Sequence, residues 1–295
     1  LLSPHNLTGR RYMKIVIASG KGGTGKTTVS AALVSIWDRP AAAVDLDVEE
    51  PNLHLFLRPE INHSQQVNME IPTVDLEKCT FCGKCQDICR FNAVAVLKND
   101  VMFFDNLCHS CGGCKAVCPE DAITETDRSL GEVEQGTAEP VEFTHGRLEI
   151  GQVMVPPIIK QVRTHTDPDK ITIIDAPPGT SCPVIAAMNQ TDFVVLVTEP
   201  TPFGLHDLEL AVQTVREMTL PHGIVINRAG LGNDDVKAFA EREGIPVLME
   251  IPFDRKLAQI YSKGRIMANE IPELKKDFQA LFQKITDQVE KETVN

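Results

Sequence analysis

The chain has 295 residues, of which 42% are hydrophobic and 24% charged, as in a globular protein with a sizeable core. Its 29 basic and 41 acidic side chains give a net charge of −12, which argues against nonspecific nucleic-acid binding. No apolar run approaches the roughly 20 residues of a membrane-spanning helix. Residues 1–12 lack the apolar segment of a secretory signal, and we interpret them as a tag or non-native leader before a native start at Met13. We therefore expect a cytoplasmic protein.

Apolar runs alternate with helix-like segments over most of the chain. A strand predicted over 13–18 leads into a glycine-rich loop, a helix over 26–37 and a second strand over 41–47. Later strands are predicted over 171–175, 192–199, 223–227 and 245–251, with helices near 205–218 and 234–243. Buried strands alternating with helices predict an α/β fold, in which a mostly parallel sheet carries helices on both faces.

The segment 274–291 places its apolar residues on one face of a predicted helix. Two interpretations are open, a helix packed on the sheet and a helix lying on a membrane surface. Membrane-surface helices usually carry Lys and Arg on the polar face, whereas this segment mixes acids and bases, which favours packing in the core. The apolar face consists of Leu274, Phe278, Leu281, Phe282, Ile285 and Val289.

Residues 20–27 match the phosphate-binding loop pattern G-x-x-x-x-G-K-[ST], and they lie between a predicted strand and a predicted helix. Backbone N–H groups of such a loop, together with the helix N-terminus, bind phosphates. Lys26 would reach the terminal phosphates and the Thr27 hydroxyl would ligate Mg²⁺. The strand and helix on either side disfavour a chance glycine turn. The predicted nucleotide-binding residues of the loop are Gly20, Gly22, Gly23, Thr24, Gly25, Lys26, Thr27 and Thr28.

A second lysine, Lys21, opens the loop and is not needed to hold phosphates of the same subunit. The segment KGGTGKTT (21–28) resembles the deviant Walker A family, which includes MinD/ParA-type ATPases, the nitrogenase iron protein and Mrp-type iron–sulfur carriers. The resemblance implies Mg²⁺-dependent hydrolysis of ATP to ADP in an ATP-dependent homodimer. It also implies that Lys21 contacts the nucleotide of the facing subunit, as an arginine finger does.

Two acidic segments extend the resemblance. VDLD (44–47) ends the second strand, and Asp47 matches the family position that orients the attacking water, a match that Asp45 makes less well. IIDAPPGT (173–180) matches the family's Walker B and switch II segment, in which Asp175 would hold the Mg²⁺ shell. A carboxylate at the carboxyl end of an apolar strand is where an open α/β sheet places ligands, which favours this role over a turn cap.

The resemblance also covers positions around the adenine and in the later switch. Asn227 and Pro252 match family positions near the base, although both residue types are common in turns. Gly179 matches a position that moves when the γ-phosphate is lost. The segments TEPTPFGLHDL (198–208) and IPFDRKLAQIYSKG (251–264) look like the same family, so the resemblance covers nearly everything after residue 13.

Eight of the nine cysteines lie between residues 79 and 118. Because a cytosolic chain keeps its thiols reduced, such clustering indicates metal binding and not disulfides. Two C-x₂-C-x₂-C-x₃-C runs repeat with an offset of 29 residues, the pattern of two-cluster bacterial ferredoxins, in which the fourth cysteine ligates the other cluster. One [4Fe–4S] cluster is therefore assigned to Cys79, Cys82, Cys85 and Cys118, and the other to Cys108, Cys111, Cys114 and Cys89.

Structural zinc is the alternative, but zinc sites use paired C-x₂-C units and not two four-cysteine runs. Pro119 matches the proline that follows the last cysteine of the pattern, whereas Arg90 departs from it. We predict that residues 67–129 form an inserted α+β ferredoxin-like domain, which interrupts a P-loop ATPase domain made of 13–66 and 130–295.

The ninth cysteine, Cys182, follows Asp175 by seven residues. The nitrogenase iron protein has a cluster-bearing cysteine near this place, but its cluster needs two cysteines per subunit and this chain has no second spare one. We therefore interpret Cys182 as a small buried residue near switch II.

Three functions follow from the resemblance to MinD-superfamily ATPases with an inserted ferredoxin domain. The first is an ATP-gated redox ATPase that passes electrons to an unknown partner. The second is an iron–sulfur cluster carrier or assembly factor with an unknown client protein, which the closed cysteine pattern disfavours. The third is a MinD- or ParA-like spatial organiser, which the acidic balance and the lack of a basic terminal helix disfavour because DNA and membrane surfaces are anionic.

Overall fold

The computed structural model describes residues 12–37, 40–165 and 170–294. The proposed leader over 1–12 therefore lies outside the described residues except for Tyr12. Nine strands form one sheet in the order β11-β10-β9-β1-β8-β2-β7-β6-β3, and the first seven of these run parallel. The parallel strands are β1 (Met13–Ala18), β2 (Ala41–Asp45), β7 (Val141–Leu148), β8 (Ile171–Asp175), β9 (Phe193–Thr198), β10 (His222–Ala229) and β11 (Val247–Pro252).

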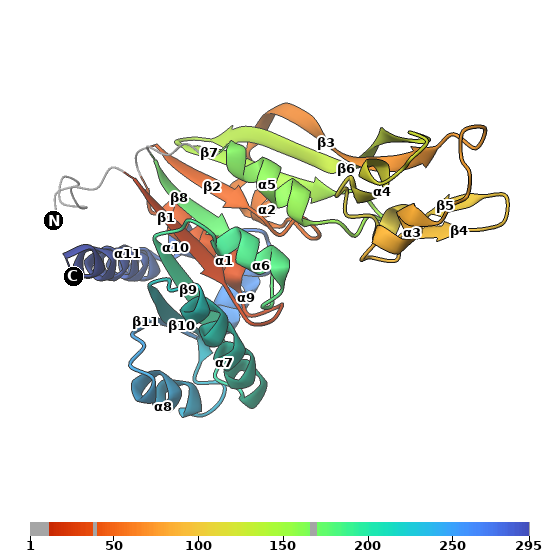
Figure 1. The fold of residues 1–295 in the computed structure, drawn as a ribbon. Coiled ribbons are helices and arrows are strands. Elements are labelled where there is room, and N and C mark those ends of the chain that lie inside the picture. Colours follow the sequence, from red (N-terminus) through yellow and green to blue (C-terminus); the bar gives the residue numbers. More distant parts are fainter. Residues whose placement is uncertain (1–11, 38–39, 166–169, 295) are drawn as a thin grey trace.

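Helices cover both faces of this sheet (Figure 1), which confirms the predicted α/β fold. The inner faces of the helices are buried in two hydrophobic clusters, one on each side of the sheet. One side carries α1 (Lys26–Ser35), α2 (Leu53–Leu57), α9 (Arg255–Ser262), α10 (Met267–Glu270) and α11 (Pro272–Val294). The other carries α5 (Pro156–Thr164), α6 (Cys182–Met188), α7 (Pro202–Glu217) and α8 (Asp235–Arg242).

The last helix, α11, packs in the core, as its apolar face predicted. All six residues of that face are at most 7% exposed. The ring of Phe282 meets Trp37 edge-on, with 4.5 Å between ring centroids, which ties α11 to the end of α1. Within the described ranges, no helix is both long and apolar enough to cross a membrane.

Three strands of the sheet were missing from the sequence interpretation, namely β7 and two long strands. β3 (Glu60–Val74) and β6 (Ile123–Ala138) pair antiparallel and continue the sheet beyond β7 as a two-stranded ribbon. The first seven residues of β3 are exposed, so they show no apolar alternation that would predict a strand. The predicted boundaries at 67 and 129 fall inside β3 and β6, and the division of the chain into two domains stays a prediction.

One face of the ribbon is packed against the body of the protein. Val67, Met69 and Ile71 of β3 are buried in the hydrophobic cluster that also contains Ile158 of α5. The partly buried Cys108, which lies past the end of the ribbon, packs against the same cluster. The ribbon is therefore braced by side-chain packing as well as by strand pairing.

The ribbon leads to a small unit that we call the cysteine module, residues 75–122. In Figure 1 it lies beyond the ends of β3 and β6, away from the parallel strands. Its elements are α3 (Lys84–Ile88), β4 (Val94–Val96), β5 (Val101–Phe103), a 3₁₀ turn (Asp105–Leu107) and α4 (Gly113–Ala116). The buried members of its hydrophobic cluster are Cys85, Val94, Val101 and Ile123, the last from β6.

Candidate nucleotide site and cysteine-lined cavities

The glycine-rich loop joins β1 to α1 at the carboxyl edge of the sheet. Gly23 and Gly25 have φ values of 79° and 95°, in the left-handed region that favours glycine. A Cβ on Gly25 would lie 2.3 Å from Nδ2 of Asn227, and a Cβ on Gly20 would lie 2.0 Å from the carbonyl oxygen of Asp207. The glycines therefore set both the curvature of the loop and its close packing on β10 and α7.

A cavity with about 1430 Å³ of empty space opens beside this loop. Its lining also includes Asp47, Glu50 and Asn52, which precede α2, Phe253, which follows β11, and Tyr261 of α9. Among the predicted nucleotide-site residues, those that line it are Gly22, Gly23, Gly25, Lys26, Thr27, Thr28, Asp47, Asn227 and Pro252. The remaining ones, Gly20, Lys21, Thr24 and Asp175, do not line it.

Asp175 lies behind the loop, where its carboxylate accepts two hydrogen bonds. The Thr27 hydroxyl donates at 2.6 Å and the Ser30 hydroxyl at 2.8 Å. Burial raises the pKa of Asp175, an effect that the Thr27 hydrogen bond and Lys26 oppose. The pair of Thr27 and Asp175 has the oxygen-donor chemistry that Mg²⁺ prefers, so these residues fit the ion at a phosphate-binding loop.

Asp45 and Asp47, which the sequence could not fully separate, have different surroundings. The buried Asp45 carboxylate accepts hydrogen bonds from the backbone N–H of Asp47 at 3.0 Å and of Leu53 at 2.9 Å. Burial and the nearby Asp175 raise its pKa well above the ordinary value. Asp47 lines the cavity, and burial raises its pKa to about 6 while Lys26 opposes the shift. Asp45 therefore organises the segment, and Asp47 is the one of the two carboxylates that lines the cavity.

Lys21 turns away from the cavity of its own subunit. Its Nζ lies 3.9 Å from Oε2 of Glu199, and the side chain is 31% exposed. Glu199, just past the end of β9, also pairs through Oε1 with the guanidinium of Arg228. Sequence reasoning missed Glu199 as a partner of Lys21, because 178 residues separate them; the only signal was its place in the family-like segment TEPTPFGLHDL.

Asn227 of β10 lines the cavity and bonds to the phosphate loop. Its Nδ2 donates to the carbonyl oxygen of Thr24 at 2.8 Å, and its Oδ1 accepts from the backbone N–H of Arg228 at 2.9 Å. Pro252, Phe253 and Arg228 line the cavity near it. Arg228 and Phe253 are further candidate nucleotide contacts that the sequence interpretation did not include.

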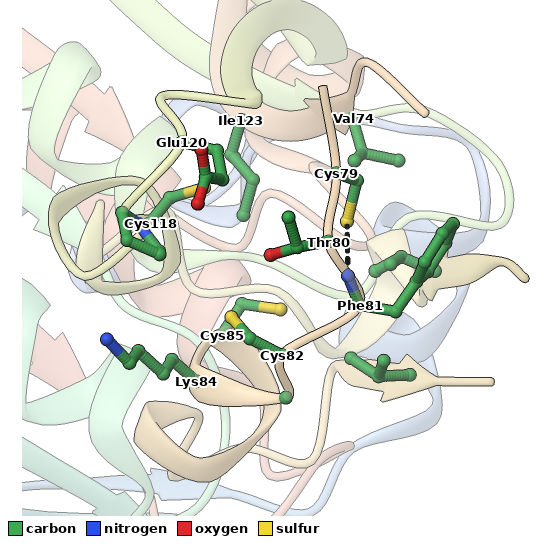
Figure 2. Close-up of a pocket in the computed structure, with 14 residues that line it drawn as sticks. Val74, Cys79, Thr80, Phe81, Cys82, Lys84, Cys85, Cys118, Glu120 and Ile123 are labelled. Atoms are coloured by element: carbon green, nitrogen blue, oxygen red, sulfur yellow. Dashed lines mark hydrogen bonds between the residues drawn. The ribbon is translucent and has the colours of Figure 1, made fainter. Parts of the chain in front are cut away.

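In the cysteine module, the four thiols of the first predicted set line one cavity. Figure 2 shows Cys79, Cys82 and Cys85 around this space, with Cys118 on its other side. The cavity has about 370 Å³ of empty space and is otherwise walled mainly by apolar groups such as Phe81. Cys118 comes from the second cysteine run, so the crossed arrangement brings both runs to this cavity.

The thiols of the second predicted set line another cavity, with about 530 Å³ of empty space. Glu70 and Pro72 of β3 also line it, so this cavity lies beside the ribbon. The rings of Phe91 and His109 stack at its wall, with 3.6 Å between centroids and 14° between planes. Its cysteines are Cys89, Cys108, Cys111 and Cys114.

Backbone N–H groups point at the sulfurs with the same offset as the sequence repeat. Phe81 and Ser110 donate to Cys79 and Cys108, each at 3.4 Å. Ala93 and Ala122 donate to Cys89 and Cys118, at 3.2 and 3.3 Å. Hydrogen bonds to sulfur are one of the ways in which proteins set the potential of iron–sulfur clusters, so the thiols and their surroundings fit [4Fe–4S] groups.

The surroundings of the thiols also bear on the alternative that the module binds structural zinc. Burial raises the pKa of Cys85, Cys108 and Cys114, so their thiolates need nearby positive charge. In the part of the chain that the structure describes, no three His, Cys, Asp or Glu side chains converge on the position of a single ion. The eight thiols instead border the two cavities.

The interpretation of Cys182 as a buried residue was wrong. Cys182 is exposed and occupies the first turn of α6, directly after the N-cap residue Ser181. The apolar residues of this helix that face the core are Val184, Ala187 and Met188, so the helical phase leaves Cys182 on the outer side.

Comparisons with known proteins agree with this fold and with the nucleotide site. The family model described as the CobQ/CobB/MinD/ParA nucleotide binding domain matches residues 15–267. The chain therefore belongs to this family of P-loop nucleotide-binding proteins. The cell division ATPase MinD of Pyrococcus furiosus has the same fold, with a TM-score of 0.55 and 24% identity over 95% of this chain and 99% of its own.

Three relatives in sequence differ in what is known of them. The uncharacterized protein MJ0579 of Methanocaldococcus jannaschii is 30% identical over 257 residues, 85% of this chain and 90% of its own. An iron-sulfur cluster carrier protein of Pyrococcus furiosus is 25% identical over 276 residues, 85% of this chain and 77% of its own. The polyferredoxin protein MvhB of Methanothermus fervidus is 37% identical over 60 residues, 19% of this chain and 14% of its own.

Proposed function

We propose that this protein is an ATP-hydrolysing switch that holds two [4Fe–4S] clusters and uses its nucleotide state to control electron transfer to a partner protein. Membership of the CobQ/CobB/MinD/ParA family supports nucleotide binding. Two cavities, each lined by four cysteines of the two-cluster ferredoxin pattern, support the clusters. When bound, the clusters supply reversible one-electron storage.

The residues of the nucleotide site divide the work of hydrolysis. Thr27 and Asp175 hold the Mg²⁺ shell, and Lys26 neutralises the terminal phosphates. Asp47 orients the attacking water. Lys21 adds its charge to the phosphates of the facing subunit in an ATP-dependent homodimer, a role that fits its direction away from the cavity of its own subunit.

The observation that carries the proposal is the position of α2, between the nucleotide cavity and the base of the ribbon. At its start, Leu53 is tied to the carboxylate of Asp45. On one side, Phe56 contacts Tyr261 of the cavity wall, with 5.5 Å between ring centroids. A segment that closes on the γ-phosphate before α2 must therefore displace α2 or strain these contacts.

The other side of α2 meets β7, the strand that pairs with β6 of the ribbon. The ring of His54 contacts the buried ring of His145 on β7, with 5.3 Å between centroids. His145 in turn bonds through Nε2 to the carboxylate of Glu134 on β6 at 2.8 Å. Burial lowers the pKa of both imidazoles, which favours their neutral forms. This contact series joins the nucleotide switch to a strand that starts at the cysteine module.

The test is a potentiometric titration of the clusters with ADP, with a non-hydrolysable ATP analogue and without nucleotide. Couplings between sites of about 1–3 kcal/mol correspond to shifts of roughly 45–130 mV for a one-electron couple. Because linkage is reciprocal, reduction must change the affinity for nucleotide by the same free energy. Lys26→Ala, which removes the direct cation of the phosphates, is the control and should show no nucleotide-dependent shift at the same nucleotide concentration. Equal potentials in all three states, with equal nucleotide affinity of oxidised and reduced protein, would contradict gated electron transfer.

A second candidate function is cluster delivery, which is supported by the 25% identity to the iron-sulfur cluster carrier protein of Pyrococcus furiosus. Cys82 and Cys111 are exposed, so each cavity has one thiol in reach of an acceptor. Incubation of the loaded protein with an apo-ferredoxin separates the two functions. Transfer of iron to the acceptor favours delivery, whereas transfer of electrons with the iron retained favours the redox switch.

A further inference from the structure

We infer that Glu199 is a positioning residue that holds Lys21 away from the phosphates until a second subunit arrives, with Arg228 as the cation that stays behind when Lys21 leaves. The inference rests on the proposed role of Lys21 in the facing subunit. It adds to that role a named carboxylate and a mechanism of release.

Glu199 is built into a fixed position at the carboxyl edge of the sheet. The residue is 7% exposed, and its carbonyl oxygen accepts a hydrogen bond from the backbone N–H of Thr201 at 2.8 Å. Gly204, in the first turn of α7, packs so closely that a Cβ there would lie 2.3 Å from the same carbonyl oxygen. Because the backbone is held in this way, the carboxylate has little freedom to follow a departing lysine.

The two cations around Glu199 differ in how firmly they are held. Lys21 reaches Oε2 at 3.9 Å, which is too long for a direct hydrogen bond, at the end of a flexible four-carbon side chain. Arg228 bonds directly to Oε1 through Nη1. Arg228 is thus the tight partner of Glu199 and Lys21 the loose one.

The backbone of Arg228 is fixed in an unusual conformation. Its φ of 53° lies in the left-handed region, and the side chain of Asn227 caps its N–H at 2.9 Å. In the loop that follows β10, a Cβ on Gly232 would lie 1.5 Å from the carbonyl oxygen of Pro200, so this loop packs tightly against the residue that follows Glu199. Because its backbone is held in place by this packing, Arg228 can remain paired with Glu199 while the dimer forms.

This arrangement solves an electrostatic problem of the dimer. A lysine that moves to the facing nucleotide leaves its former carboxylate behind, and an unpaired buried carboxylate is strongly destabilising. Arg228 prevents this, because Glu199 keeps one direct ion pair after Lys21 has left. Lys21 can then give up its long ion pair with Glu199 and bind the phosphates of the facing subunit at a small net cost in free energy.

The test measures dimer formation against protein concentration, by sedimentation velocity with saturating Mg²⁺ and a non-hydrolysable ATP analogue. Glu199→Gln keeps the size of the side chain and removes its charge. Two Lys21 side chains are released per dimer, so the dimer dissociation constant should fall by about two- to thirtyfold. Glu217→Gln removes the same charge from the exposed end of α7 and should leave the constant unchanged.

Arg228→Gln should act in the opposite direction, because Lys21 is then the only cation beside Glu199 and its departure leaves a buried carboxylate unpaired. Nucleotide affinity is measured in parallel, since Arg228 lines the cavity. The double variant that combines Glu199→Gln with Lys21→Ala should dimerise no better than Lys21→Ala alone, whereas an effect of Glu199 that does not act through Lys21 would still strengthen dimerisation relative to that single variant.

The outcomes separate this inference from the function on which it rests. If Lys21→Ala dimerises like the wild type, the role of Lys21 in the facing subunit is wrong. If Lys21→Ala fails to dimerise but Glu199→Gln leaves the constant unchanged or raises it, only the role of Glu199 is wrong. A gain that persists in the double variant also overturns it.

Discussion

The nucleotide-binding body and the cysteine module organise their sites by different means. In the body, Asp175 is already bonded to Thr27 and Ser30, and two hydrophobic clusters hold the sheet from both sides. In the module, the thiols border two cavities, and the hydrophobic cluster has four buried members, one of them a cysteine. The body is thus preorganised by its own side chains, whereas the module has a small core, to which the proposed metal groups would add stability.

The largest effect should come from the two loop lysines, which test the body alone. Lys26→Ala should abolish tight nucleotide binding because the phosphates lose their direct cation. Lys21→Ala should keep ATP affinity but lose dimer formation and hydrolysis, with turnover reduced by about 10³-fold or more if it acts like an arginine finger. Calorimetry and steady-state turnover measure the two effects. Equal loss of ATP affinity in both variants would show that Lys21 acts within its own subunit.

Removal of iron should separate the module from the body. After chelation without oxygen, backbone amides of residues 75–122 should exchange hydrogen rapidly, since binding of metal is coupled to folding in domains with small cores. Amides of β1 and β8, in the centre of the parallel sheet, should keep their protection. Hydrogen exchange measured by mass spectrometry reads both regions in one experiment. Unchanged protection in the module would mean that it folds without its clusters.

Iron content tests which single cysteines of the module bind the clusters. The reconstituted protein should hold about eight irons per chain, from two four-iron clusters. Cys85→Ser should lower this by about four, because one cluster loses a buried ligand. Cys182→Ala is the matched control and should leave the count unchanged, since Cys182 lies outside both cavities. A loss of several irons in that variant would show that the crossed assignment is incomplete.

The smallest expected change in free energy concerns Asp47, a residue that lowers the stability of the body at neutral pH but that the proposed hydrolysis needs. Burial raises the pKa of this carboxyl from 3.8 to about 6, so folding favours its protonated form and the nucleotide-free protein loses stability as pH rises from about 4 to 6. The full difference corresponds to about 3 kcal/mol, and partial solvent exposure reduces the expected value to about 1–2 kcal/mol. Asp47→Asn should therefore be more stable than wild type at pH 7.5, with no such gain at pH 4, while hydrolysis is lost. Urea unfolding at the two pH values measures the stability difference.

Sequence patterns predicted the body well because its strands are buried on both faces and its helices have one apolar face. β1 and β8 were predicted with their observed bounds, and the core position of α11 followed from its apolar face. β3 was missed because its first half is exposed on both sides, so its stability comes from backbone pairing with β6 and not from a pattern of side chains.

In the nucleotide site, a local pattern located the loop and the acidic residues but not the contacts between distant segments. The different roles of Asp45 and Asp47 depend on which of the two carboxylates accepts a hydrogen bond from the N–H of Leu53. The sequence alone does not distinguish two aspartates so close together. The pairing of Lys21 and Arg228 with Glu199 depends on the order of strands in the sheet. The cysteine spacing did predict the two sets of thiols that line the cavities, because the ferredoxin pattern specifies which cysteines share a cluster.

The packing of the ribbon has a consequence for how a partner reaches the clusters. Because Val67, Met69 and Ile71 share one hydrophobic cluster with α5, and Cys108 packs against it, the module does not swing on a loose tether. Clusters held in the module, as proposed, would therefore keep their place relative to the body and would not move between a donor and an acceptor. In the proposed redox function, a partner would therefore have to come to the module, which lies at the far end of the ribbon from the parallel strands (Figure 1).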